Sequence, residues 1–361
     1  MKNILISTGG SGGHVVPATI IYEHLKDEFN VCMTSDQRGI KFLDRDKYNI
    51  KIINLPKVSK NIFLVPFQMI LLLGLTIRSF FFLKKKKIEI LISTGGYMSF
   101  PMCLASKLLK IKLLLYEPNM VLGRSNKFFI KNCSKIFCYS DKIKNFPNKL
   151  RGKITLIPAL LRKNFYEING NEKKIQNAEL SKKEINLLII GGSQGAKLFD
   201  TVIKNSIVDL SKKYKLNIFQ QTKANNFHDL KNFYLSKKIQ NQLFDFNDDI
   251  YNYMKKTDIC ITRAGASTLA ELIFLNIAHI AIPLPSAKDN HQFENASFYR
   301  HLDCNWIVDQ HENEINLTSK LLNIIENKDE FLNKKNNMKS FSCQNTWNNI
   351  NQKLINTINE Y

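Results

Sequence analysis

The heptapeptide ILISTGG occurs twice in this chain, at residues 4–10 and again at residues 90–96. A related stretch, LLIIGGSQG, begins at Leu187. In each case an apolar run with the length of a buried strand ends directly in glycines. A strand followed by a glycine turn and a helix brings several backbone N–H groups onto one anion. The repeat therefore predicts parallel strands that end in loops of phosphate size.

Short apolar runs alternate with longer amphipathic stretches along the chain, which is typical of βαβ units around a parallel sheet. A polar segment without strand periodicity, residues 163–184, separates two such series and is the expected linker. Strands are expected over 3–7, 31–34, 51–55, 88–93, 112–116 and 135–139, and then over 185–190, 216–220, 243–246, 259–262 and 279–283. With 361 residues, the chain is predicted to form two doubly wound α/β domains in tandem. Trp347, Ile350 and Leu354 have helical spacing in the tail and predict a closing helix.

The charge and the cysteines limit the classes of function. The 52 Lys and Arg against 31 Asp and Glu give a net charge of +21, which favours an anionic partner such as nucleic acid, a membrane or a phosphorylated substrate. A compositional bias toward Lys, Ile and Asn explains the charge equally well. The seven cysteines show no C-x-x-C spacing, so reduced core residues of a cytosolic protein are expected, with neither disulfides nor zinc. A glycine turn follows the first strand at once, so no signal peptide is expected.

Residues 62–83, IFLVPFQMILLLGLTIRSFFFL, are long enough to span a bilayer. Pro66, Gln68 and Arg78 interrupt the apolar run, and the next strand is expected a few residues later. A buried crossover helix and a transmembrane span are both alternatives. The favoured interpretation is a helix in the membrane interface, because three consecutive phenylalanines stand beside the run Lys84–Lys87.

The first glycine loop, STGGSGGHVVPA over Ser7–Ala18, is not a dinucleotide fingerprint, because the third glycine after Gly10 and Gly12 is replaced by Val15. It is not a Walker A loop either, because no G-K-[ST] follows. His14 stands where the loop meets the expected helix and is a candidate base, although a lone histidine is more often structural.

Other loops follow the expected strands at the edge where open α/β sheets bind ligands. They are STGGYMSFP from Ser93, YEPNMVLGRSN from Tyr116, GGSQGAK from Gly191, TRAGASTLAEL from Thr262 and PLPSAKDNHQFENA from Pro283. Ser193 and Gln194 can donate to an anion, and Glu271 can accept both hydroxyls of a ribose while its helix N-terminus holds phosphates. Asp289, Asn290, His291, Gln292 and Asn295 suit a sugar better than a metal. The NDD run at 247–249 is weak evidence for a divalent cation and is more often a turn or cap.

In this order and spacing, GGSGGH, STGGYMSFP, YEPN, GGSQGA, RAGASTLAE and DNHQFENA resemble the MurG-type glycosyltransferases of family 28. The resemblance implies the GT-B fold, in which two Rossmann-like domains face each other across a cleft. It implies inverting transfer of N-acetylglucosamine from UDP-GlcNAc to the C4 hydroxyl of undecaprenyl-pyrophosphoryl-MurNAc-pentapeptide (lipid I), giving lipid II for peptidoglycan. No cofactor and no metal are expected.

The resemblance also implies roles for residues. Glu271 is expected to hold the ribose, Gln292 the sugar hydroxyls and Ser193 a phosphate. The full set expected to contact UDP-GlcNAc is Ser11, Gly12, Gly13, Asn119, Arg162, Ser193, Gln194, Asn247, Ala266, Ser267, Thr268, Leu269, Ala270, Glu271 and Gln292. The acceptor diphosphate is expected at Gly9, Gly10, Gly95 and Gly96. His14 is the expected base, with Glu117 as the second candidate.

Two motifs depart from the family pattern. The usual HEQN is YEPN here, so Tyr116 and Pro118 replace a His and a Gln, and the usual GNPVR is PALLR over Pro158–Arg162. The acceptor and membrane-associating domain is expected over residues 1–162, completed by a C-terminal helix over 340–361, and the donor domain over 163–339.

The expected partners are UDP-GlcNAc, lipid I, an anionic membrane surface bound through Ile62–Lys87, and other cell-wall synthesis proteins. The expected location is the cytoplasmic face of the bacterial inner membrane, as a peripheral protein. The alternatives are another UDP-sugar enzyme on this fold, such as a glycolipid glycosyltransferase or a UDP-GlcNAc 2-epimerase, and a nucleic-acid binder. The last is suggested by charge alone, and no nucleic acid is expected because no binding motif is present.

Overall fold

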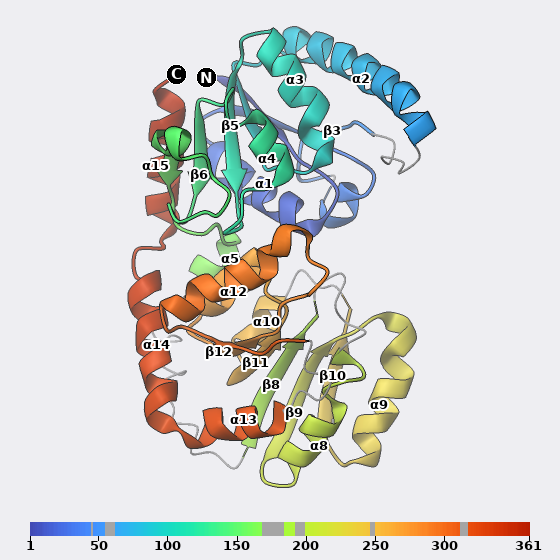
Figure 1. Cartoon of the computed structure of the whole chain (residues 1–361), viewed down its shortest axis with the longest axis vertical. Helices are drawn as coiled ribbons and strands as arrows, with labels where there is room; N and C mark the ends of the chain where they lie inside the picture. The colour runs from blue at the N-terminus through green and yellow to red at the C-terminus, as the bar shows by residue number, and fades with distance from the viewer. Residues whose placement is uncertain (45, 55–61, 168–183, 192–198, 246–249, 311–316) are drawn as a thin grey trace. The chain divides into compact units, whose positions relative to one another are not determined.

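The computed structural model describes residues 1–44, 46–54, 62–167, 184–191, 199–245, 250–310 and 317–361. The chain forms two compact units (Figure 1). The N-terminal unit consists of residues 1–161 together with 346–361, and the C-terminal unit of residues 162–345. Each has its own parallel sheet and its own apolar core.

The described strands of the N-terminal unit form one sheet in the order β3-β2-β1-β4-β5-β6-β7, and all their pairings are parallel. The strands are β1 (Asn3–Ser7), β2 (Asn30–Ser35), β3 (Ile50–Ile52), β4 (Ile90–Ser93), β5 (Lys112–Glu117), β6 (Lys135–Cys138) and β7 (Ile154–Leu156). The α-helices of this unit are α1 (Gly12–Leu25), α2 (Val65–Lys85), α3 (Phe100–Leu108), α4 (Arg124–Phe129) and α15 (Trp347–Asn359).

The two copies of the heptapeptide lie side by side in this sheet. β1 and β4 are neighbours, and Ile4 pairs with Ile90 and Ser7 with Ser93, so each residue of one copy is opposite the same residue of the other. Just beyond the strands, the buried Thr94 hydroxyl donates to the Thr8 hydroxyl over 2.8 Å. The strand order reverses its direction between β1 and β4, and such switch points are where open α/β sheets bind ligands.

The C-terminal unit repeats this topology, with its described strands in the order β10-β9-β8-β11-β12-β13. The strands are β8 (Glu184–Ile190), β9 (Lys215–Gln221), β10 (Gln240–Phe244), β11 (Ile259–Thr262), β12 (Ala278–Ala281) and β13 (Trp306–Ile307). The α-helices are α5 (Lys163–Tyr166), α8 (Lys204–Ser211), α9 (Phe227–Ser236), α10 (Ile250–Met254), α11 (Ala266–Phe274), α12 (His291–His301), α13 (Leu317–Glu326) and α14 (Lys328–Ser342). Here the switch point lies between β8 and β11.

The predicted strands are present, with differences at their ends. The predicted strand 51–55 is β3, and its last predicted residue, Leu55, lies outside the described residues. The predicted strand 243–246 begins three residues earlier as β10, and Phe246 lies outside the described residues. β7 and β13 were not predicted, because edge strands of three and two residues are too short to show a period. The tail forms a new helix at Trp347, where the Thr346 hydroxyl caps the Asn349 N–H over 3.2 Å.

Helix α2 is mostly exposed, which is not what a buried crossover helix shows. It packs on α3 (Figure 1) through a narrow stripe formed by Thr76, Ser79 and Leu83. At 100° per residue, the opposite face carries a row of exposed apolar side chains. These are Phe67 (59% exposed), Ile70 (67%), Leu73 (61%), Ile77 (50%) and Phe81 (63%), and Phe63 (87%) stands just before the helix in the 3-10 turn Ile62–Leu64. By length and composition α2 could cross a membrane. Its most apolar stretch of 18 residues has a mean hydropathy of 1.7, and 11% of that stretch is buried.

All seven cysteines are free thiols. Five are buried and Cys32 is half-buried. Cys343 is exposed, so the prediction that the cysteines are core residues is wrong at this position. The reason is that Cys343 ends α14 just before the chain begins α15, outside any strand.

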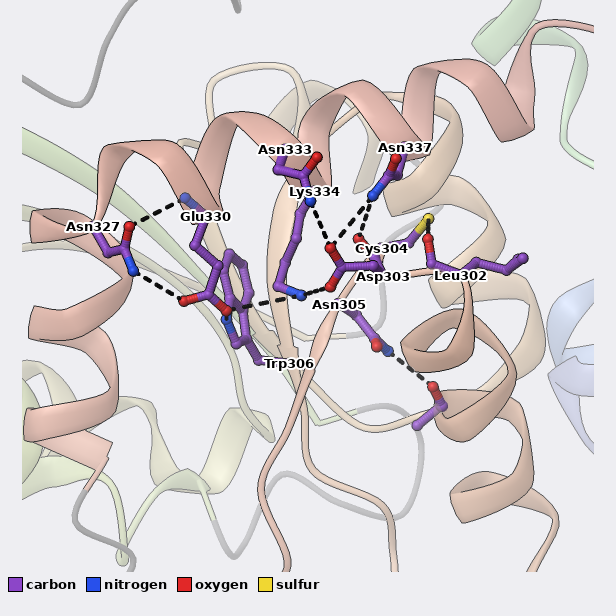
Figure 2. A network of polar contacts seen from close by, with 11 residues as sticks. Leu302, Asp303, Cys304, Asn305, Trp306, Asn327, Glu330, Asn333, Lys334 and Asn337 are labelled. Atoms are coloured by element: carbon purple, nitrogen blue, oxygen red, sulfur yellow. Dashed lines mark hydrogen bonds and ion pairs between the residues drawn. The ribbon is translucent and has the colours of Figure 1, made fainter.

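A polar network holds α14 against the turn before β13 (Figure 2). The Lys334 side chain is 6% exposed and forms an ion pair with Asp303, and its Nζ lies 3.8 Å from Glu330. Asp303 Oδ2 also accepts from the Asn333 amide over 2.8 Å. The Trp306 indole N–H donates to Glu330 over 2.6 Å, and the Lys334 ammonium lies 5.1 Å from that ring's centroid. The buried charge of Lys334 thus depends on two carboxylates.

The two partners of this ion pair should respond unequally to mutation. In Asp303→Asn the new asparagine tolerates the positive φ of 51° at this position. The buried Lys334 is left with a weaker partner, so we expect the free energy of unfolding of the C-terminal unit to fall by about 2 kcal/mol. Lys334→Met should cost less than about 1 kcal/mol, because Asp303 is 48% exposed and keeps its asparagine donors. Urea unfolding followed by Trp306 fluorescence in a Trp347→Phe background measures the C-terminal unit separately. A larger loss for Lys334→Met would contradict this account.

Candidate functional site

His14 lies at the switch point of the N-terminal sheet, in the first turn of α1. Its Nδ1 lies 2.9 Å from the Thr94 carbonyl oxygen, which belongs to the second heptapeptide copy. A carbonyl can only accept, so this contact places the imidazole proton on Nδ1 and the lone pair on Nε2. The second copy thus orients the histidine that follows the first, and the ring is in the tautomer that a base requires.

The second glycine loop makes room for this ring. Gly95 and Gly96 have φ of 87° and 80°, a region that favours glycine. A Cβ on Gly96 would lie 3.2 Å from His14 Cδ2, and one on Gly95 would lie 3.4 Å from the ring. The Gly95 N–H donates to the Ser93 hydroxyl over 3.2 Å. The described contacts of this loop therefore support the histidine more directly than they support an anion.

The first glycine loop contacts a residue that was not predicted. Asp36, at the end of β2, is buried, and its Oδ1 accepts from the Gly10 N–H over 2.8 Å. Gly10 was predicted as part of an acceptor diphosphate loop, but its N–H donates to Asp36. An anion at this edge would instead meet the first N–H groups of α1, at Gly12 and Gly13, because the first turn of a helix leaves its donors without intrahelical partners.

Glu117, the second candidate base, is 2% exposed and accepts hydrogen bonds on both oxygens. Oε1 accepts from the backbone N–H and the side-chain amide of Asn119 over 3.1 and 3.2 Å. Oε2 accepts from the Gly123 N–H over 2.7 Å and from the Asn126 amide over 2.9 Å. Burial raises the pKa of Glu117, and these donors oppose the rise. The contacts favour a carboxylate that shapes the loop after β5, and they leave His14 as the stronger candidate base.

Asn126 links that loop to the others and was not predicted as a functional residue. Its amide donates to Glu117 and, over 3.0 Å, to the Tyr116 carbonyl oxygen. A Cβ on Gly95 would lie 3.7 Å from this amide. The loops after β1, β4 and β5 therefore meet around His14.

In the C-terminal unit, α11 begins after the cap residue Gly265 at the switch point next to β11. Ala266, Ser267 and Thr268 are half-buried and present the helix N-terminus, whereas Leu269 and Ala270 are buried. The Leu269 N–H donates to the Gly265 carbonyl oxygen over 3.0 Å, so of the predicted contacts in this stretch those of the first turn are the most accessible.

Glu271 is not a solvated helix glutamate, since it is 6% exposed. Burial raises its pKa, and the positive charge of Arg162 acts in the opposite direction. The structure places this carboxylate about one and a half turns into a helix that follows a switch point, within the electrostatic influence of Arg162, which was predicted from a separate motif.

Helix α12 is tied to the same edge of the sheet. The Gln292 Oε1 accepts from the Leu284 N–H over 2.9 Å, which leaves the amide NH2 of Gln292 to donate. The fully buried Asn295 donates to the Ala264 carbonyl oxygen over 3.2 Å. Arg263, which was not predicted, is buried and donates to the Ile282 carbonyl oxygen and to Gln310 over 3.1 and 2.8 Å. Burial lowers the pKa of Arg263 to about 10.

Three predicted residues, Ser193, Gln194 and Asn247, lie outside the described residues, as do Asp248 and Asp249 of the NDD run. Among the residues that the structure describes, no group of three or more His, Cys, Asp or Glu side chains could hold a metal ion.

Comparison with known proteins assigns the chain to a family. The model of the glycosyltransferase family 28 N-terminal domain matches residues 4–138, and that of the family 28 C-terminal domain matches residues 186–350. The chain is 60% identical over 360 residues, 99% of both chains, to the UDP-N-acetylglucosamine--N-acetylmuramyl-(pentapeptide) pyrophosphoryl-undecaprenol N-acetylglucosamine transferase of Pelagibacter ubique. It is 34% identical to the protein of the same name from Rickettsia bellii, over 91% of this chain and 92% of the relative.

Solved structures show the same fold. The crystal structure of Acinetobacter baumannii MurG superposes with a TM-score of 0.77 at 23% identity and covers 100% of both chains. The UDP-GlcNAc 2-epimerase of Neisseria meningitidis has a TM-score of 0.67 at 14% identity, also over 100% of both chains. The predicted GT-B α/β fold is therefore confirmed. On its domain matches and its full-length identity, the chain belongs to glycosyltransferase family 28, as a member of the MurG type.

Proposed function

We propose that this enzyme transfers N-acetylglucosamine from UDP-GlcNAc to the C4 hydroxyl of undecaprenyl-pyrophosphoryl-MurNAc-pentapeptide, giving lipid II. The observation that carries the proposal is the 60% identity over 99% of the chain to a transferase named for this reaction. The geometry at His14 and Glu271 supplies the chemical groups that such a reaction needs.

The proposed step is a direct displacement with inversion. The acceptor C4 oxygen forms a bond to C1 of the sugar while the bond from C1 to the UDP oxygen breaks, and the electron pair leaves with UDP. The hydroxyl proton passes to Nε2 of His14. This nitrogen carries the lone pair, because Nδ1 holds the ring proton in its hydrogen bond to the Thr94 carbonyl oxygen. Because a general base must lie within hydrogen-bond reach of the proton it takes, a fixed ring orientation at the mouth of the loop supports this role.

The donor is proposed to bind the C-terminal unit. The N-terminus of α11 offers backbone N–H groups to the diphosphate, and Arg162 adds a positive charge near Glu271. Glu271 accepts the two ribose hydroxyls, and the amide NH2 of Gln292 donates to a sugar hydroxyl. Preorganised donors of this kind stabilise a leaving diphosphate without a metal, each by roughly 3 kcal/mol.

The acceptor is proposed to bind the N-terminal unit. Its diphosphate was expected at Gly9, Gly10, Gly95 and Gly96, but because the Gly10 N–H donates to Asp36, we propose it instead at the first turn of α1, where Gly12 and Gly13 had been assigned to UDP-GlcNAc. We further propose that the exposed apolar face of α2 lies in the interface of the cytoplasmic membrane leaflet, with Lys84–Lys87 on anionic headgroups. About nine-tenths of the most apolar stretch of α2 is not buried in the protein, which supports contact with lipid. The protein would then be peripheral, next to a lipid-linked substrate and other cell-wall synthesis proteins.

Removing the proposed base should lower the rate of transfer and leave nucleotide binding intact. We expect His14→Gln to reduce kcat by about 10²- to 10⁴-fold, with the Kd for UDP unchanged. The measurement is transfer of radiolabelled N-acetylglucosamine to a lipid I analogue in the presence of EDTA, with NMR of the product to establish a β-linkage from the α-linked donor.

The matched control is His228→Gln, whose side chain is 85% exposed in the other unit. Loss of wild-type transfer in EDTA would contradict the metal-free mechanism. Release of free UDP with epimerised sugar, and no transfer to lipid, would move the chain to the epimerase alternative.

Donor binding should depend on the ionised form of Glu271. Because burial raises its pKa above that of an ordinary glutamate, the carboxylate is protonated at a higher pH than an exposed glutamate, and the Kd for UDP-GlcNAc should rise as the pH is lowered from neutral. Glu271→Gln should raise the Kd at neutral pH by about tenfold to a hundredfold and remove this pH step. Isothermal titration at several pH values measures both effects, and an equal pH step in the variant would contradict the role of Glu271.

Membrane binding should depend on the exposed face of α2. The triple variant Phe67→Ser, Ile70→Ser, Leu73→Ser should weaken binding to phosphatidylglycerol vesicles by at least about tenfold. Added salt should weaken wild-type binding, because the lysine run acts by charge. The matched control changes three exposed leucines of the other unit, Leu235, Leu302 and Leu332, to serine. Equal binding by both triple variants, measured by vesicle co-sedimentation, would overturn the proposal.

A further inference from the structure

We propose that Asp36 is a positioning residue for the transfer, because its carboxylate fixes the first glycine loop and, through that loop, the start of the helix that carries His14. This inference rests on the proposed function of the N-terminal unit. Asp36 stands at the end of β2, 22 residues from His14 in the sequence, and belongs to none of the glycine motifs.

The carboxylate of Asp36 is 2% exposed and connects three donors. Oδ1 accepts from the Gly10 N–H over 2.8 Å and from the Gly39 N–H over 2.9 Å. Oδ2 forms an ion pair with Arg38 Nε at 2.7 Å. Burial raises the pKa of Asp36, but the bonds from Gly10, Arg38 and Gly39 outweigh burial and lower it. The group is therefore ionised at neutral pH and holds its donors with charge-assisted bonds.

The backbone around this carboxylate is packed without space for a side chain. Gly9 has a φ of 154°, and a Cβ there would lie 2.8 Å from Asp36 Oδ1 and 2.9 Å from Met98 Cβ. A Cβ on Gly39 would lie 3.1 Å from Gly9 Cα. The loop after β1 is thus enclosed between the turn after β2 and the 3-10 turn Tyr97–Ser99 after β4.

The position of this loop affects the position of His14 by two routes. Along the chain, Gly10 precedes Ser11, whose carbonyl oxygen accepts from the His14 N–H over 3.0 Å. Through space, a Cβ on Gly96 would lie 3.2 Å from both the Gly9 carbonyl oxygen and His14 Cδ2, so the loop, the second glycine turn and the ring are in successive contact. A displaced Gly9–Gly10 peptide would therefore move the first turn of α1 and the ring together.

Asp36 is not proposed to contact the acceptor C4 oxygen or C1 of the sugar. Because it acts through the position of His14, its loss should lower the rate of transfer. Misplacement of a catalytic group by about 1 Å can cost about 100-fold in rate. We expect Asp36→Ala to lower kcat by about 100-fold and to raise KM for the lipid acceptor. Because UDP is proposed to bind the other unit, its Kd should stay within about twofold of the wild type.

Asp36→Asn separates hydrogen bonding from charge. Asparagine keeps an oxygen for the Gly10 and Gly39 N–H groups, and the half-exposed Arg38 side chain can turn away from the new amide. We expect kcat of Asp36→Asn to return to within about tenfold of the wild type. The matched control is Asp46→Ala, which removes an exposed carboxylate ten residues further along the chain and should leave kcat unchanged.

Hydrogen exchange of the peptide over residues 8–14 gives a readout that does not depend on turnover. Exchange there should be faster in Asp36→Ala than in Asp36→Asn, while exchange in β5 and β6 stays at wild-type rates. Wild-type kcat in Asp36→Ala, unchanged exchange over 8–14, or an Asp36→Asn variant as slow as Asp36→Ala would each overturn the inference. If the wild type itself transferred no sugar, the proposed function would fail, and the exchange result would still decide whether Asp36 holds the loop.

Discussion

The in-register pairing of β1 with β4 is the constraint on which the N-terminal site depends. Because the two strands have the same sequence and the same register, they end at the same height, and their glycine turns begin side by side at the switch point. A hydrogen bond between the hydroxyls of Thr94 and Thr8 joins the ends of the two strands. The two copies differ in their next contact, because the Thr94 carbonyl oxygen accepts a hydrogen bond from His14. The histidine follows the first copy, and the second copy supplies the Thr94 carbonyl oxygen that accepts its hydrogen bond and the glycines that leave room for its ring.

Three buried carboxylates, Asp36, Glu117 and Asp200, each accept several hydrogen bonds and hold loops of the two units. Asp36 holds the loop after β1, and Glu117 holds the loop after β5. In the C-terminal unit, Asp200 accepts from Gln220, Thr222 and Asn226, beside the end of β9. A carboxylate that is saturated with N–H and O–H donors can stand near an anion site at a small electrostatic cost, since its charge is already compensated.

Local sequence was enough to predict the described strands other than β7 and β13, and the glycine turns after β1 and β4, because a strand and the turn after it are neighbours in the chain. It was not enough for Asp36 or Asn126, whose partners come from other strands and which belong to no periodic pattern. The two-residue strand at Trp306 was missed for lack of length. The segment at 62–83 could be assigned to a helix, but whether its apolar face was covered depended on α3, which lies elsewhere in the sequence. For Glu271, the sequence predicted its position in a helix but not that its side chain is buried.

The partner of His14 also bears on the proposed chemistry. A carboxylate beside Nδ1 would orient the ring and add a negative charge, whereas the Thr94 carbonyl orients the ring and adds none. When the imidazole accepts a proton in the proposed step, its new positive charge would then be compensated by an anionic substrate rather than by the protein. An acceptor that carries its own diphosphate supplies that charge, and the proposed place for it, the first turn of α1, is the turn that contains His14. The tautomer, the neutral partner and the charge of the substrate are therefore mutually consistent.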